Sequence, residues 1–242
     1  IYSSSKEEIY NKLSWSYSHG EAAAIPVKVS ISEIKRHYEQ SITDEESTPF
    51  LGEVSLKRPR FIEEAKGFTS AEKGTIIHFV MKNLDIKSIN DTKDIENQLL
   101  SMETRGLLTR EEKNTIFIPS LLRFYKSELA RRITDSSKVK KEVPFILSIN
   151  ANEIYKDLIS EEEIFIQGII DCYFEEEDGI VLVDYKTDFI QDKINPQIEI
   201  EKIMKKYEIQ MNLYKRAIEE ITGKEVKERC LYLFNISKAV YY

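Results

Sequence analysis

The stretch GIIDCYFEEEDGIVLVDYKTD, residues 168–188, constrains the fold more than any other part of the chain. Two runs rich in β-branched and aromatic residues flank an Asp-Gly pair, which favours a tight turn between antiparallel strands. We predict a β-hairpin with its turn over residues 176–179. A symmetric hairpin around this turn places Asp171 directly opposite Asp184.

The predicted hairpin has two faces, because side chains alternate along a strand. One face carries Asp171, Asp184 and Lys186 among apolar neighbours, and the other is almost entirely apolar, so we expect both to be at least partly buried. Two carboxylates about 5 Å apart repel by on the order of 3 kcal/mol at an effective dielectric constant of about 20. Lys186 offsets only part of this repulsion. A divalent cation offsets more, and carboxylate oxygens suit Mg²⁺ or Mn²⁺.

A second interpretation of the hairpin requires no metal. The face with the two aspartates could be exposed and carry only a lysine–aspartate ion pair. A register slip of one residue would also send the two aspartates to opposite faces. The hairpin alone therefore leaves both interpretations open.

Capping patterns and periodicity predict the helices. Three Ser/Thr-x-x-Glu patterns mark helix starts, at Ser30–Glu33, Thr69–Glu72 and Thr109–Glu112. The expected helices are a short polar one within residues 1–24 that ends at His19-Gly20, one after each capping pattern, one over 92–104, and one over 197–222 that ends at Gly223. Pro119 is expected to divide the stretch 109–133 into two helices. Residues 41–60 lack periodicity and are predicted to form a loop.

Four strands are predicted, over residues 138–150, 164–176, 179–190 and 228–238. The order is helices, three strands, a helix and a final strand. This order predicts an α/β fold with a mixed sheet, because the late helix gives room for a crossover between parallel strands.

The net charge of −7 and the pI of about 5.3 argue against a stand-alone DNA-binding protein, which is usually basic. A local basic patch must hold any nucleic acid, or another domain must deliver it. The candidate patches are Lys57–Arg60, Arg131–Arg132, Lys138–Lys141 and Lys202–Lys206.

The chain lacks an apolar run near the roughly 20 residues of a membrane helix, and it lacks a signal-peptide pattern. We therefore expect a cytoplasmic location and no membrane partner. Cys172 and Cys230 are too few for a disulfide framework or for the four thiolates of a typical iron–sulfur cluster. Because the chain begins at Ile1 and not at Met, we expect it to be a piece of a longer or processed protein.

The spacing of Asp171, Asp184 and Lys186 resembles that of the PD-(D/E)XK nucleases, and most closely the RecB-type branch. EKGTIIHFVMKNLD resembles the Gly-x-x-x-His helix of that branch, and EIQMNLYKRAIE resembles its Gln-x-x-x-Tyr helix. The segments KVSISEIK and RCLYLF resemble the boundaries of the C-terminal nuclease domain of AddA-like helicase-nuclease subunits. The two cysteines agree with this cluster-free group. The resemblance predicts a lead-in or linker over 1–24 and a nuclease domain over 25–242 with a restriction-endonuclease-like core, a mixed sheet flanked by helices.

The resemblance also implies the site. Asp171, Asp184 and Lys186 are the implied catalytic residues. The implied ligands of Mg²⁺, or of Mn²⁺ in its place, are His78, Asp171, Asp184 and the carbonyl of Tyr185. The implied DNA contacts are Gln210, Tyr214 and Tyr207, for which ordinary packing against the sheet is the alternative. Glu142 is a weaker candidate acid that is also interpretable as an edge charge.

The implied activity is Mg²⁺-dependent hydrolysis of single-stranded DNA, on the 3′-ended strand, during helicase-coupled processing of double-strand breaks for recombinational repair. The implied partners are the helicase part of the same protein and an AddB-like subunit. Two alternatives stay open, a free-standing RecB-like repair nuclease and a non-catalytic module that docks to a partner subunit. The non-Met start and the AddA-like ends argue against the free-standing nuclease. The complete set of His78, Asp171, Asp184 and Lys186 argues against the non-catalytic module.

Overall fold

The computed structural model describes residues 3–14, 25–43, 67–155, 162–192 and 194–242. The chain divides into two compact units. The first takes in residues 1–34 and 146–168, and the second takes in residues 35–145 and 169–242. The predicted domain boundary at 24/25 adjoins residues that the structure does not describe, so it stays a prediction.

The first unit contains helix α1 (Ser3–Leu13) and the short strand β1 (Lys28–Ser30). β1 was not predicted, and it pairs in parallel with the first part of strand β3 (Glu163–Glu176). The predicted N-terminal helix is present, but it ends at Leu13 and not at His19, which lies outside the described residues.

Helix α3 (Ile31–Thr43) begins directly after β1. The backbone N–H of Ser30 donates to Glu33 Oε2 at 2.8 Å, and the N–H of Glu33 donates to Ser30 Oγ at 3.2 Å. This reciprocal pair is the predicted capping box. The helix continues to Thr43, past the start of the loop predicted over 41–60. Residues 44–60 of that predicted loop lie outside the described residues.

The second unit contains six α-helices among its described residues after α3. They are α4 (Ser70–Asn83), α5 (Thr92–Thr104), α6 (Arg110–Asn114), α7 (Ile118–Tyr125), α8 (Glu128–Asp135) and α9 (Gln197–Thr222). Thr69 and Thr109 form the two other predicted capping boxes. The stretch 109–133 holds three helices and not two. Pro119 lies in the first turn of α7, where a missing N–H costs nothing, and Ser127 caps α8.

The described strands of the second unit form a mixed sheet, as predicted. Strand β2 (Val139–Asn150) pairs with β3, and the order continues through β4 (Gly179–Lys186), β5 (Val226–Leu233) and β6 (Lys238–Tyr241). β4 pairs with β3 and β6 pairs with β5 in antiparallel fashion, whereas β4 and β5 are parallel because α9 forms the crossover. The single last strand predicted over 228–238 is wrong. A turn over 234–237 divides it, and β6 follows.

The hairpin register is confirmed. Glu176 pairs with Gly179, and Cys172 pairs with Val183. Gly179 has φ 151°, a backbone angle that side-chain-bearing residues rarely adopt, so the glycine of the Asp-Gly pair is required there. Both faces of the hairpin are buried near the pair Cys172–Val183, as expected.

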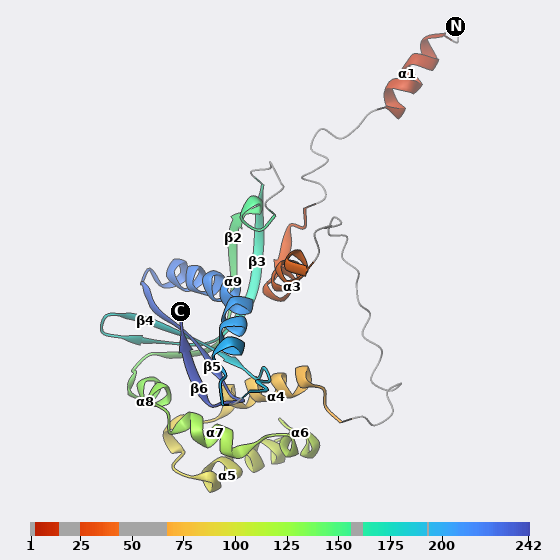
Figure 1. The fold of residues 1–242 in the computed structure, drawn as a ribbon. Helices are drawn as coiled ribbons and strands as arrows, with labels where there is room; N and C mark the ends of the chain where they lie inside the picture. The colour runs from red at the N-terminus through yellow and green to blue at the C-terminus, as the bar shows by residue number, and fades with distance from the viewer. Residues whose placement is uncertain (1–2, 15–24, 44–66, 156–161, 193) are drawn as a thin grey trace. The chain divides into compact units, whose positions relative to one another are not determined.

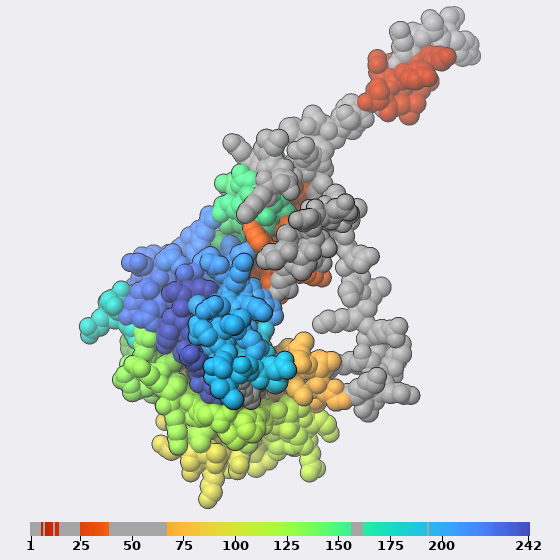
Figure 2. Space-filling view, in the orientation of Figure 1, coloured from red at the N-terminus to blue at the C-terminus, as the bar shows by residue number. Residues whose placement is uncertain are grey.

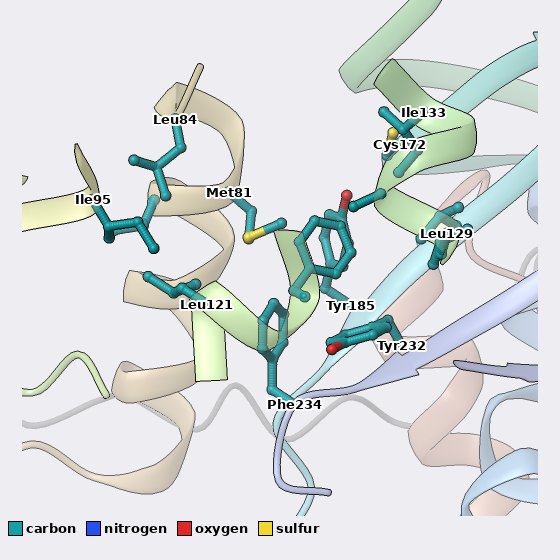
Figure 3. Close-up of a cluster of buried hydrophobic side chains, with 14 of the residues drawn as sticks. Met81, Leu84, Ile95, Leu121, Leu129, Ile133, Cys172, Tyr185, Tyr232 and Phe234 are labelled. Atoms are coloured by element: carbon teal, nitrogen blue, oxygen red, sulfur yellow. The ribbon is translucent and has the colours of Figure 1, made fainter. Parts of the chain in front are cut away.

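One sheet face forms the main core with α4, α5, α7 and α8. Figure 3 shows this cluster, in which Met81, Leu121 and Leu129 from the helices meet Cys172, Tyr185 and Tyr232 from the strands. Figure 1 shows α9 on the other side of β4 and β5, and in Figure 2 the yellow and green helices form a continuous surface. Among the described helices, none has the length and apolar character needed to span a bilayer.

Candidate active site

Asp171 on β3 contacts one residue of α4 and one residue of β4. The side chain is 8% exposed. Its Oδ1 lies 3.0 Å from Nδ1 of His78 on α4, and its Oδ2 accepts a hydrogen bond of 2.8 Å from the backbone N–H of Tyr185 on β4. The contact between Tyr185 and this site is therefore made by its amide, while its ring faces the apolar core.

Asp184 on β4 is more deeply buried, at 1% exposed. Its Oδ1 accepts a hydrogen bond of 3.0 Å from Nε2 of Gln210 on α9. Its Oδ2 forms an ion pair with Lys186 Nζ at 2.6 Å, but it accepts no properly directed hydrogen bond from the part of the chain that the structure describes. Such an under-satisfied buried oxygen is costly unless another group completes its environment.

The two aspartates differ in pKa. Burial raises the pKa of Asp184, the charge of Asp171 adds to this, and Lys186 opposes it. Burial also acts to raise the pKa of Asp171, but the hydrogen bond and charge of His78, with the charge of Lys186 and the amide of Tyr185, outweigh it, so the pKa of Asp171 is lowered. Burial acts against the imidazolium of His78, yet Asp171 outweighs that effect and the pKa of His78 is raised. His78 and Asp171 thus stabilise each other's charged forms.

Glu142 on β2 lies close to His78 and Asp171. One ligand atom each of His78, Glu142 and Asp171 lies within 4.8 Å of the others. Asp184 is not part of that group. Glu142 has φ 52° within β2, in the left-handed region that a non-glycine residue adopts only when its surroundings enforce it. The structure therefore places Glu142 beside Asp171, and burial and the charge of Asp171 raise its pKa.

Gly74 explains how α4 reaches the site. A Cβ at this position would lie 3.1 Å from Oγ1 of Thr187, which follows Lys186. The absence of a side chain at Gly74 therefore lets α4 approach Thr187 closely. His78 lies about one turn further along α4, where its ring stands edge-on to that of Tyr185 with centroids 6.3 Å apart.

The three residues implied as DNA contacts are all buried. Tyr207, Gln210 and Tyr214 on α9 are 7%, 8% and 5% exposed. Gln210 binds Asp184, and the ring of Tyr214 packs edge-on against Phe145 with centroids 5.5 Å apart. Tyr207 donates its hydroxyl hydrogen to Asp188 Oδ2 at 2.8 Å, and Lys186 Nζ lies 4.2 Å from its ring centroid. These contacts support the predicted catalytic residues Asp184 and Lys186, and the burial of both tyrosine rings leaves little ring surface for stacking on a nucleobase.

Two residues near the site carried no sequence prediction. Asp188 accepts hydrogen bonds from Tyr207 and from Lys206 Nζ at 2.9 Å. Lys35 Nζ lies 4.0 Å from the ring centroid of Tyr207. Asp188 could have been found as the last residue of the DYKTD stretch. Nothing in the sequence near Lys35 indicates its contact with α9.

Several side chains of the candidate basic patches have carboxylate partners in the described part of the chain, and Lys206 of the patch Lys202–Lys206 pairs with Asp188 at 2.9 Å. Arg132 forms a bidentate pair with Glu176, and Lys138 pairs with Glu175. Lys141 donates to the carbonyls of Met81 and Leu84 at the end of α4, at 3.0 Å each. The patch Lys57–Arg60 lies outside the described residues.

The residues present fit a divalent cation. Two carboxylates and one imidazole converge at His78, Glu142 and Asp171, a donor set that first-row divalent ions and Mg²⁺ accept. The under-satisfied Oδ2 of Asp184 and the positive φ of Glu142 are features that are concentrated at functional sites.

Comparisons with known proteins agree with this geometry. The chain is 42% identical over 240 residues to an ATP-dependent helicase/nuclease subunit of Clostridium botulinum (strain Kyoto / Type A2), and 42% identical over 236 residues to the protein of the same name from Thermoanaerobacter sp. (strain X514). These alignments cover 97% and 96% of this chain but only 18% and 19% of the relatives, so the chain spans about a fifth of their length. The model of the PD-(D/E)XK nuclease superfamily matches residues 52–242. The chain belongs to the PD-(D/E)XK nuclease superfamily.

Proposed function

We propose that this chain is a Mg²⁺-dependent nuclease domain that hydrolyses phosphodiester bonds in single-stranded DNA, with Mn²⁺ able to replace Mg²⁺. The observation that carries the proposal is the convergence of His78, Glu142 and Asp171 beside the buried pair of Asp184 and Lys186. Nuclease activity itself follows from the family. The metal and the strand type are the proposed part.

His78, Glu142 and Asp171 would hold the cation, and Asp184 with the carbonyl of Tyr185 are proposed as further ligands. When bound, the cation supplies Lewis-acid chemistry, because it polarises a phosphate oxygen and lowers the pKa of a water molecule. The 3.0 Å contact between His78 Nδ1 and Asp171 Oδ1 already holds these two proposed ligands beside each other.

Lys186 would stabilise the negative charge that grows on the phosphate during the attack. Asp184 holds its ammonium group at 2.6 Å, and Gln210 holds the other oxygen of the same carboxylate at 3.0 Å. These contacts fix the position of Lys186 before the substrate binds, which is the preorganisation that electrostatic catalysis requires. The side chain is 11% exposed, so it can reach a phosphate while staying largely out of bulk water.

The names of the similar proteins extend the proposal. Both relatives are named as ATP-dependent helicase/nuclease subunits. We propose that this chain is likewise the nuclease part of a longer helicase-nuclease, that it receives the 3′-ended strand from the helicase part, and that an AddB-like subunit is its partner. Its role would be the processing of double-strand breaks for recombinational repair. The net charge of −7 is consistent with a strand delivered by a motor domain.

The test is calorimetric titration with Mn²⁺, together with cleavage of a labelled single-stranded oligonucleotide in Mg²⁺. Wild type is compared with Glu142→Gln and Asp184→Ala, and Glu128→Gln on α8 is the control, because Glu128 is exposed and outside the site. We expect weaker metal binding and slower cleavage in both site variants and no change in the control. Wild-type protein that binds no Mn²⁺ and cleaves nothing would contradict the proposal.

A further inference from the structure

Phe189 is an exposed aromatic residue held between two anchored neighbours. Its side chain is 72% exposed. The preceding residue, Asp188, accepts hydrogen bonds from Tyr207 and Lys206. The following residue, Ile190, is fully buried and donates its backbone N–H to Oδ1 of Asn235 at 3.2 Å. The backbone of Phe189 is thus fixed on both sides while its ring faces outward.

Phe189 also lies close in sequence to the catalytic lysine. It is the third residue after Lys186, and one of the two residues between them, Thr187, is the one that approaches Gly74 of α4. Figure 2 shows the light-blue segment that follows β4 at the molecular surface, beside the orange α4. Single exposed apolar residues are common and need no function. An aromatic ring on a fixed backbone next to a phosphate-cleaving site has a specific use, because every nucleobase offers a face for stacking.

Three ammonium groups gather around the ring of Tyr207, whose hydroxyl binds Asp188, the residue before Phe189. Lys35, Lys186 and Lys206 have Nζ atoms 4.0, 4.2 and 5.1 Å from the ring centroid of Tyr207. The buried ring of Tyr207 stabilises these cations and is itself held by Asp188. Lys186 and Lys206 pair with Asp184 and Asp188, so the three ammonium groups exceed these two carboxylates by one positive charge, in a chain with a net charge of −7. Ammonium groups placed in this way suit the phosphates of a nucleic-acid backbone.

We propose that Phe189, Lys35 and Lys206 form a subsite for the nucleotide next to the scissile phosphate. Phe189 stacks on the base, and Lys35 and Lys206 contact the adjoining phosphate. Tyr207 is a positioning residue that acts through the lysines, and the buried rings of Tyr207 and Tyr214 do not stack on bases. The subsite rests on the proposed nuclease function and deepens it, because only an unpaired base can leave its neighbours and stack on Phe189. It therefore gives a physical reason for a preference for single strands.

The first experiment measures stacking without cleavage. The 242-residue chain is titrated, in EDTA, into a single-stranded oligonucleotide that carries the fluorescent base 2-aminopurine. Wild type is compared with Phe189→Ala and Phe189→Trp. Phe117→Ala is the matched control, because Phe117 is 62% exposed and lies at the start of α7. We expect wild type and Phe189→Trp to quench the fluorescence. Phe189→Ala should lose the quenching, and its Kd for single-stranded DNA should rise about tenfold.

The expected pattern is specific to single strands. The Kd for blunt duplex DNA should be the same in Phe189→Ala and wild type, and an oligonucleotide with abasic positions should bind to wild type as weakly as the normal one binds to Phe189→Ala. If Phe189→Ala quenches and binds like wild type and Phe117→Ala, the stacking proposal is wrong. Because Phe189 is exposed, its replacement should leave the melting temperature unchanged, so misfolding would not imitate the expected result.

The second experiment tests the lysines through salt dependence. Lys35→Ala and Lys206→Ala should each reduce the slope of log K against log salt concentration by about one, because each removes one phosphate contact. Lys126→Ala at the end of α7 is the control and should keep the wild-type slope. Unchanged slopes in both site variants would overturn the assignment of the phosphate contacts.

Cleavage assays on the same proteins separate this subsite from the proposed function. If wild type cleaves single-stranded DNA and Phe189→Ala cleaves it with the same KM and kcat, the subsite fails and the nuclease proposal stands. If wild type neither binds nor cleaves DNA with Mg²⁺ or Mn²⁺, the nuclease proposal fails and the subsite fails with it. We expect a raised KM with little change in kcat for Phe189→Ala.

Discussion

Both ends of the β3–β4 hairpin carry several charged side chains, but the carboxylates at the two ends differ in burial and in the number of their cationic partners. At the turn end, Glu176 accepts two hydrogen bonds of 2.8 Å from Arg132, which also binds Glu228 at 2.8 Å. Lys227 adds a contact to Glu176 at 2.6 Å. Every carboxylate of this network has a directed cationic partner.

At the other end of the hairpin, the carboxylates are deeply buried and have fewer cationic partners. Asp171 and Asp184 are 8% and 1% exposed, and the charge of Asp171 acts unfavourably on that of Asp184. Lys186 pairs with Asp184, while Oδ2 of that carboxylate accepts no directed hydrogen bond from the described residues. Additional positive charge would stabilise the ionised forms of these two carboxylates, and a divalent cation supplies such charge.

The comparison shows that the number of charges does not mark a functional site. The turn end has more ion pairs, and those pairs lower the pKa of Glu176 to about 2. The other end has fewer partners and raises the pKa of Asp184 by burial. A buried charge with few partners is the more informative signal, because carboxyl groups with pKa values raised by burial beside a specific charge partner are concentrated at functional sites.

Replacing Asp171 should give the largest effect. In Asp171→Asn, His78 and the Tyr185 amide lose the carboxylate that holds them together. We expect loss of measurable Mn²⁺ binding and a decrease in cleavage rate on the order of 10³-fold or more, since metal chemistry lowers the barrier by several kcal/mol. Calorimetry and single-turnover cleavage measure the two effects. Retained Mn²⁺ affinity would show that this end of the hairpin does not hold the metal.

Replacing Lys186 should separate charge stabilisation from metal binding. Lys186→Met removes the ammonium beside Asp184 and keeps an unbranched side chain of similar length. We expect cleavage to slow by about 10² to 10³-fold, because one preorganised group that stabilises the transition state is lost. Mn²⁺ affinity should change by only a few-fold. If the affinity disappears together with cleavage, Lys186 has a structural role and not the proposed one.

Replacing Gln210 should have a smaller effect. The side chain fixes Oδ1 of Asp184, and groups that orient a ligand usually matter by about 10 to 100-fold. We expect a decrease of that size in cleavage by Gln210→Leu. Gln197→Leu, at the start of the same helix and away from Asp184, should cleave at the wild-type rate. Equal rates for the two variants would mean that α9 serves only to pack against the sheet.

Replacing Arg132 at the turn end should affect stability and leave catalysis unchanged. Arg132→Met removes the partner of Glu176 and Glu228, and we expect the free energy of unfolding to fall by about 1 to 3 kcal/mol. Urea unfolding at pH 7 measures this loss. The cleavage rate in Mg²⁺ should equal that of wild type under conditions where the variant is folded. A slower rate would remove the functional distinction between the two ends of the hairpin.

The smallest effect should be a pH dependence at the turn end. The hydrogen bonds from Arg132 outweigh burial and lower the pKa of Glu176 from 4.5 to about 2. Between these values the unfolded state binds more protons, so the ion pair stabilises the fold fully above about pH 4.5 and loses that effect as the pH falls to about 2. The urea midpoint of wild type should therefore fall more steeply across this window than that of Glu176→Gln. Parallel curves would contradict this assignment.

Local physics accounts for the predictions that the structure confirms. The capping boxes at Ser30, Thr69 and Thr109 involve residues three apart, so a short pattern is sufficient to predict them. The two missed strands, β1 and β6, are three and four residues long and depend on pairing with strands formed elsewhere in the chain. Too few residues carry their pattern for a sequence to reveal them.

The candidate site was predicted in parts. The motifs singled out His78, Asp171, Asp184 and Lys186, and the structure brings these four together. Glu142 received little weight, because its closeness to Asp171 depends on a positive φ within β2 that no sequence pattern announces. The tyrosines of α9 were expected to contact DNA, and their burial directs attention to Phe189.

The sequence by itself determined the hairpin. The Asp-Gly turn and the alternation of side chains set the register, and the register places Asp171 and Asp184 near each other, because both depend only on neighbouring residues. The tertiary structure alone decided which groups surround these carboxylates. His78 is 93 residues from Asp171 in the chain, and Gln210 is 26 residues from Asp184. Such partners are chosen by how α4, α9 and the sheet pack together, and packing is a property of the whole fold and not of any short segment.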